Sequence, residues 1–219
     1  MNENISNTSV IRVLIVDDHP LARQGVRAML AQAPDIEVAG EASDGAEAMA
    51  LVEQLRPDVV LLDVEMPGPR AWEVEACIRE HYPQTIGLVL SAHNRDTYLS
   101  EMMDAGAVGY LDKQIPAPQL VQAIRRAARG EYLFEAEQSR RAHHWRTEVL
   151  ARWERLSPRE KEVLQALAQE ASTHEIAQQL GISPQTVSTH ICKLIRKLEV
   201  KNRAEALTWA WTHGLIENP

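Results

Sequence analysis

Three aspartates stand directly after apolar runs, where their carboxylates could together hold a cation. Asp17 and Asp18 follow the run at 11–16, and Asp63 follows the run at 58–62. Continuous apolar runs of this length are typical of buried parallel strands, and the functional crevice of such a sheet lies at the carboxyl ends of its strands. Clustered carboxylates repel one another unless a cation lies between them. We therefore interpret the three as a site for a hard divalent ion, Mg²⁺, rather than as turn residues.

Strand-like and helix-like patterns alternate over the first part of the chain. We expect strands near residues 11–17, 36–41, 58–63, 85–90 and 108–111. We expect helices near residues 20–32, 44–55, 71–82, 95–105 and 117–129. Gly106 and Gly130 stand where helix-ending glycines belong. This alternation predicts an α/β domain over residues 10–130, a doubly wound five-stranded parallel sheet of the flavodoxin-like kind.

Composition limits the classes of protein to which the chain can belong. Its 219 residues suit one large or two small domains, and a net charge of −8 argues against a general nucleic-acid binder. No apolar stretch approaches a membrane span, and we expect no export signal in the polar residues 1–9. Cys77 and Cys192 are too few and too far apart in sequence to suggest a disulfide scaffold. We expect a cytoplasmic protein with no membrane partner.

A polar segment at 131–154 separates two parts of different character. Trp145, Val149 and Trp153 recur there at four-residue spacing, which favours a partly helical linker, with a disordered tether as the alternative. The adjacent pair His143-His144 points to different helix faces, so we interpret it as solvated surface and not as a metal site.

Residues 155–219 have the signature of an all-α, four-helix domain. Capping boxes begin helices at Ser157 and Ser172, and Gly181 ends the second of these helices just before another starts at Pro184. From residue 155 onward eight Lys or Arg balance seven Asp or Glu, so this part is nearly neutral while the rest is acidic. Short helices joined by a tight turn with a glycine predict a helix-turn-helix.

The helix expected at 184–198 has an apolar stripe and an opposite polar, basic stripe that suits the major groove of DNA. The candidate base-reading residues are Gln185, Ser188, Thr189 and Cys192. The candidate phosphate contacts are Lys193, Arg196, Lys197, Lys201 and Arg203, with Thr186 and His190 also near the DNA backbone. The alternative is a stripe that is simply solvated or that binds protein.

The first domain resembles the receiver domain of bacterial two-component response regulators over residues 10–130. The resemblance is carried by the pair Asp17-Asp18, by Leu-Leu-Asp63-Val-Glu65-Met-Pro-Gly, by Ser91-Ala92 and by Tyr110-Leu-Asp-Lys113. Gln114 replaces the proline common after the lysine, and Arg70-Ala71 replaces a segment that often contains glycine. The departure at Gln114 concerns the local loop geometry and leaves the charge of Lys113 in place.

The receiver resemblance implies a role for each of these residues. Asp63 would be the phosphoacceptor, and Mg²⁺ would be held by Asp17, Asp18 and Asp63 together with the backbone carbonyl of Glu65. Lys113 and Ser91 would bind phosphoryl oxygens, and Tyr110 would follow the inward movement of Ser91.

The second domain resembles the LuxR-type helix-turn-helix of the NarL/FixJ class. The matching residues are Leu156-Ser-Pro-Arg-Glu160, Glu175-Ile-Ala, Leu180-Gly-Ile-Ser, Thr186-Val187, His190, Lys197-Leu198 and Asn202-Arg203. This resemblance implies binding to double-stranded DNA as a homodimer.

Together the two resemblances identify a DNA-binding response regulator and not an enzyme. A sensor histidine kinase would phosphorylate Asp63 and thereby control dimerisation and transcription. One alternative is a transcription factor whose receiver serves dimerisation or ligand sensing without phosphorylation. The other is a phosphatase with Asp63 as its nucleophile, which fits poorly because Glu65 stands where an acid/base aspartate is common.

Overall fold

The computed structural model describes residues 10–216, so the polar segment in which no export signal is expected lies outside the described residues. The chain divides into two compact units, one comprising the residues up to 94 with 98–139 and the other 95–97 with 140 onward. The division falls inside the segment predicted as a linker.

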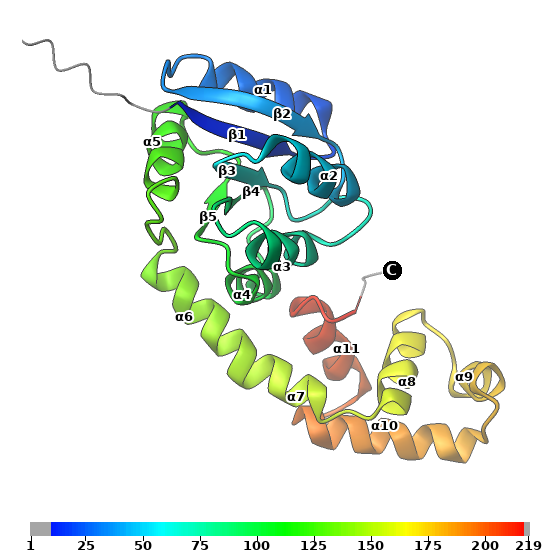
Figure 1. Cartoon of the computed structure of the whole chain (residues 1–219). Helices are drawn as coiled ribbons and strands as arrows, with labels where there is room; N and C mark the ends of the chain where they lie inside the picture. The colour runs from blue at the N-terminus through cyan, green and yellow to red at the C-terminus, as the bar shows by residue number, and fades with distance from the viewer. Residues whose placement is uncertain (1–9, 217–219) are drawn as a thin grey trace, which may run out of the picture. The chain divides into compact units, whose positions relative to one another are not determined.

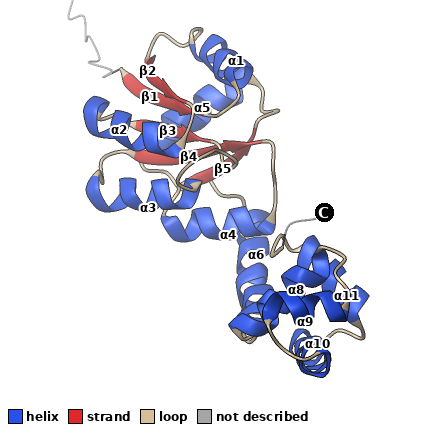
Figure 2. Ribbon diagram, turned by 90° about the vertical axis from the view of Figure 1, so that its right-hand side faces the viewer, coloured by secondary structure: helices blue, strands red, loops and turns tan. Residues whose placement is uncertain are grey.

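The first unit contains the five-stranded parallel sheet that the sequence predicts. Its strands run in the order β2-β1-β3-β4-β5, with every neighbouring pair parallel (Figure 2). The strands are β1 (Ile11–Val16), β2 (Ile36–Ala42), β3 (Val59–Leu62), β4 (Ile86–Ser91) and β5 (Gly109–Asp112). The strand order reverses direction at β1 and β3, and this reversal opens a crevice at their carboxyl ends.

The helices also lie where the sequence pattern predicts them. They are α1 (Pro20–Leu30), α2 (Gly45–Leu55), α3 (Ala71–His81), α4 (Asp96–Ala105) and α5 (Ala117–Ala127) (Figure 1). Asp44 caps α2 by accepting hydrogen bonds from the backbone of Ala46 and Glu47. Gly106 and Gly130 have φ angles of +103° and +74°, which a side chain would disfavour. Gly106 directly follows the end of α4 as predicted, whereas α5 ends at Ala127, before Gly130.

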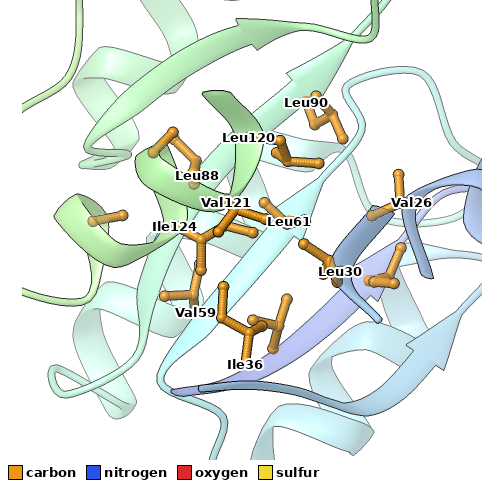
Figure 3. Packing of buried hydrophobic residues seen from close by; sticks show 14 of the residues in the cluster. Val26, Leu30, Ile36, Val59, Leu61, Leu88, Leu90, Leu120, Val121 and Ile124 are labelled. Atoms are coloured by element: carbon orange, nitrogen blue, oxygen red, sulfur yellow. The ribbon is translucent and has the colours of Figure 1, made fainter. Parts of the chain in front are cut away.

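The sheet buries apolar side chains on both faces, as a doubly wound sheet must. On one face, alternate strand residues such as Val59, Leu61 and Leu88 pack against Leu30 of α1 and Ile124 of α5 (Figure 3). The intervening strand residues are also fully buried and point to the opposite face, where α2 and α3 pack (Figure 2). This rigid core holds the strand ends in place.

The segment predicted as a linker is helical from Ala136 to Glu154. It comprises α6 (Ala136–His144), the π-helical η1 (Trp145–Leu150) and α7 (Ala151–Glu154). Trp145 and Val149, two of the residues at four-residue spacing, are buried. Because these side chains are buried, their packing favours an ordered helix over the disordered-tether alternative.

The second unit is helical and contains the expected helix-turn-helix. After α7, its helices are α8 (Pro158–Ala168), α9 (Thr173–Leu180), α10 (Pro184–Leu198) and α11 (Arg203–Thr212). Ser157 and Ser172 form the predicted capping boxes, and Gly181 has a φ of +64° between α9 and α10. The core between the helices is made of Val163, Leu164, Ile176, Val187, Leu194 and Leu198. Among residues 10–216, no helix combines the length and apolarity needed to cross a membrane.

Candidate functional site

The three predicted aspartates converge at the carboxyl ends of β1 and β3. Asp17 and Asp63 are 4% and 3% exposed, and the Asp63 amide donates a 2.9 Å hydrogen bond to the carbonyl of Val16, which joins the two strand ends. Carboxylate oxygens of Asp17, Asp18 and Asp63 lie within 4.8 Å of one another. Two adjacent parallel strands that end at the same edge account for this convergence.

Lys113 completes the cluster from the carboxyl end of β5. Its Nζ lies 2.6 Å from Oδ2 of Asp17 and 2.8 Å from Oδ2 of Asp63. Burial by itself lowers the pKa of Lys113, but the hydrogen bonds to the two carboxylates outweigh it and raise the pKa above its ordinary value. The lysine is therefore a fixed positive charge beside Asp63.

The cluster has the donor set and the charge that a divalent cation requires. Three carboxylates gather here and the ammonium group of Lys113 contacts two of them, which leaves a residual negative charge in a largely buried place. Oδ1 of Asp18 is buried and makes no hydrogen bond. Oxygen ligands with residual charge suit Mg²⁺, so these residues fit the predicted ion.

His19 also belongs to this cluster, and sequence reasoning missed it. It follows Asp18 and occupies the N-cap position of α1. Its Nδ1 lies 2.6 Å from Oδ1 of Asp18, an ion-pair distance without hydrogen-bond alignment, and its backbone N–H donates to Asp17 over 2.9 Å. Its place next to the aspartate pair was the available signal.

The carboxylate of Glu65 does not join the acidic cluster. It accepts a 2.7 Å hydrogen bond from the Tyr98 hydroxyl, and its other oxygen lies 3.0 Å from Nε2 of His93. These contacts tie the loop after β3 to the segment after β4. The metal contact predicted for this residue is its backbone carbonyl, which stays a prediction. The pairing with His93 and Tyr98 depends on tertiary structure and has no local sequence signal.

Ser91 is the last residue of β4, and Tyr110 lies in the neighbouring strand β5. Ser91 is 1% exposed, and its Oγ accepts a hydrogen bond from the His93 amide over 3.2 Å. The buried Tyr110 donates its hydroxyl proton to the carbonyl of His93, and burial raises the pKa of this tyrosine. Both side chains therefore contact the segment that follows β4. A movement of this segment would therefore change the hydrogen bonds of both side chains.

The predicted DNA-contacting residues divide into two groups on α10 and after it. Most are exposed, and the exposed group comprises Gln185, Thr186, Ser188, Thr189, Cys192, Lys193, Arg196 and Lys201. The half-buried group comprises His190, Lys197 and Arg203.

The half-buried cations have partners inside the second unit. Nζ of Lys197 lies 2.7 Å from Oε2 of Glu160, a residue only 2% exposed, and Arg203 donates to the carbonyl of Ala171. Although burial raises the pKa of Glu160, Lys197 and the Ser157 amide outweigh it and hold that pKa below its usual value. Lys197 and Arg203 thus have structural roles that the sequence did not indicate.

Comparison with protein families gives two matches that cover most of the chain. Residues 13–125 match the response regulator receiver domain, and residues 154–210 match the LuxR family of bacterial regulatory proteins. The first match contains the acidic cluster and Lys113, and the second contains α10.

Individual relatives match along nearly their whole length. An uncharacterized transcriptional regulatory protein, YxjL of Bacillus subtilis, is 36% identical and covers 96% of this chain and 100% of its own. Response regulator protein VraR of Staphylococcus aureus is 35% identical, and the match covers 94% of this chain and 99% of VraR.

Solved structures of regulators also align with the chain. RcsB of Salmonella typhimurium aligns with a TM-score of 0.57 at 28% identity, covering 92% and 98% of the two chains. ChrA, described as a response regulator in a heme-sensing two-component system, aligns with a TM-score of 0.57 at 33% identity, covering 95% and 100%.

Proposed function

The chain belongs to the response regulators that combine a receiver with a LuxR-type DNA-binding domain, and on this premise we propose that phosphorylation of Asp63 controls its binding to DNA. The observation that supports the proposal most directly is the contact of Lys113 Nζ with both Asp17 and Asp63 at the crevice of the sheet. This contact supports the proposal because the nucleophile that we propose, Asp63, then has a cation and further carboxylates beside it.

The proposed reaction is transfer of a phosphoryl group from a phosphohistidine of a sensor kinase. A carboxylate oxygen of Asp63 attacks phosphorus, the bond from phosphorus to the imidazole nitrogen breaks, and the imidazole leaves with that electron pair. The amide of Val64 donates to Oδ1 of Asp63 over 2.8 Å and so fixes the orientation of the carboxylate. Lys113 then stabilises the negative charge of a phosphoryl oxygen.

Asp17, Asp18 and Asp63 are the side chains that would hold Mg²⁺, with the backbone carbonyl of Glu65 as a further ligand. The bound ion would neutralise phosphoryl charge and align the group for transfer. His19 lies close enough to hold the carboxylate of Asp18 in place.

The proposed output is a dimer that binds DNA and regulates transcription. Ser91 would bind a phosphoryl oxygen, and Tyr110 would respond because both contact His93. The exposed residues of α10 would then enter the major groove in each half of the dimer. With DNA and a kinase's phosphohistidine as the proposed partners, this activity would take place in the cytoplasm.

Relatives described as a transcriptional regulatory protein and as a response regulator favour this function over a phosphatase. A receiver that works without phosphorylation remains the second candidate, and a labelling experiment separates it from the first. Incubation with acetyl phosphate and Mg²⁺, read by intact-mass spectrometry, should add one phosphoryl group to the wild type. Asp63→Asn should add none, while the exposed charge-matched control Glu53→Gln should label normally. Stoichiometric labelling of the Asp63 variant would contradict the assignment.

A further inference from the structure

Two hydroxyl groups on the exposed side of α10 already donate their protons inside the helix. Ser188 Oγ donates to the carbonyl of Pro184 over 3.1 Å, and Thr189 Oγ1 donates to the carbonyl of Gln185 over 3.0 Å. A hydroxyl has one proton to donate and two lone pairs with which to accept. Both side chains therefore present acceptor oxygens to whatever approaches this side of the helix.

The other candidate base readers beside these hydroxyls are uncharged, so the direction of the hydroxyl hydrogen bonds matters more for base recognition. Gln185, Ser188, Thr189 and Cys192 are all exposed, and none of them carries a charge. The nearby exposed cations, Lys193 and Arg196, are the ones predicted to contact phosphates. The bidentate contact from Arg or Lys, which is the commonest way to read guanine, is thus missing from the four candidate base readers.

We propose that Ser188 and Thr189 read DNA as hydrogen-bond acceptors from base amino groups. In the major groove only adenine N6 and cytosine N4 donate, whereas guanine and thymine present acceptors. The half-site should therefore place adenine or cytosine opposite these two residues. This inference rests on the proposed function, because it requires α10 to enter the groove.

The competing arrangement is a hydroxyl that rotates to donate its proton to N7 of a purine or to O6 of guanine. That rotation breaks the hydrogen bond to the helix carbonyl, and a base amino group requires no such loss. The two arrangements use different atoms of the same base pair, so replacing single atoms of the DNA distinguishes them.

The experiment begins with selection of operators from a random duplex library by the full-length protein activated with beryllofluoride and Mg²⁺. In the best operator each adenine is replaced in turn by purine, which lacks the N6 amino group, or by 7-deazaadenine, which lacks N7. Each cytosine is likewise replaced by 2-pyrimidinone, which lacks the N4 amino group. Affinity is measured by fluorescence anisotropy at one salt concentration.

We expect loss of one amino group to lower affinity roughly tenfold. At an adenine, loss of N7 should change affinity less than twofold. The amino-group effect should disappear in Ser188→Ala or in the near-isosteric Thr189→Val. Lys193→Ala is the matched control, since it should weaken binding to every duplex and keep the pattern of analogue effects. Thermal melting verifies that each variant is folded.

The proposal would be overturned if loss of N7 lowered the affinity and loss of the amino groups did not. Analogue effects that persist unchanged in both hydroxyl variants would overturn it as well. In either case sequence-specific binding by α10 would stand. If the proposed function is wrong, the result is different. The selection then yields no preferred operator, and Lys193→Ala and Arg196→Ala bind DNA as the wild type does.

Discussion

At the scale of single residues, Lys113 has the most consequential position in the receiver. It balances two carboxylates that are almost completely buried, those of Asp17 and Asp63. A buried charge that loses its partner destabilises the fold more than the intact pair stabilises it. The same residue that would stabilise a phosphoryl group therefore also balances the charge of the two buried carboxylates.

We predict that Lys113→Ala lowers the free energy of unfolding of the receiver by about 2 kcal/mol in the absence of divalent ions. Mg²⁺ should restore part of this loss, because a cation in the crevice again balances the carboxylates. Denaturant unfolding with and without Mg²⁺ measures both effects, with Gln114→Ala as the exposed neighbouring control. Equal stability of the two variants without Mg²⁺ would show that Lys113 does not balance this charge.

At the scale of elements, the packing of α3 on β4 buries a carboxyl group that the proposed chemistry does not use. Glu75 of α3 is 1% exposed, and a side chain at Gly87 of β4 would meet its Oε2 at 1.7 Å. Burial raises the pKa of Glu75 from 4.5 to about 7, although Arg79 opposes the rise. The absence of a side chain on one element thus makes room for an acid on the other.

We predict that the receiver loses stability as pH rises through this range because of Glu75. The unfolded chain releases the proton near pH 4.5 and the folded chain near pH 7, so the destabilisation grows between these values and is complete above them. The shift corresponds to at most roughly 3 kcal/mol. Glu75→Gln should remove this pH dependence and be more stable than the wild type at pH 8.

Unfolding by urea at pH 5, 6.5 and 8 measures the effect. Glu80→Gln, an exposed substitution on the same helix, should follow the wild-type curve at all three values. If Glu75→Gln also follows that curve, the buried carboxyl is not the source of the pH dependence.

At the scale of the whole molecule, the proposed function requires an event at Asp63 to change the oligomeric state and the affinity for DNA. The side chains of Ser91, Tyr110 and Glu65 all contact His93, the last through its carboxylate. A phosphoryl group that attracts Ser91 would compete with these contacts.

We predict that beryllofluoride with Mg²⁺ increases the dimer fraction of the wild type and its affinity for DNA, each by tenfold or more, a coupling within the usual allosteric range. Ser91→Ala should accept a phosphoryl group at Asp63 and yet remain mostly monomeric. Sedimentation velocity measures the dimer fraction, and intact-mass spectrometry measures the label. A labelled Ser91→Ala protein that dimerises like the wild type would contradict the role given to Ser91.

The sequence alone determined those features that depend on neighbours along the chain. Apolar runs predicted the strands, capping boxes at Ser157 and Ser172 predicted helix starts, and glycines such as Gly106 predicted helix ends. The convergence of Asp17 with Asp63 was also predictable, because parallel strands that alternate with helices end at one edge.

Only the tertiary structure decided which side chains share a charge or a proton. Lys113 lies 50 positions from Asp63, and Lys197 lies 37 positions from Glu160, so no local periodicity links them. The burial of Glu75 depends on the absence of a side chain at Gly87 in another element. Spacing along the chain determines backbone elements, whereas contacts between distant residues depend on how those elements pack.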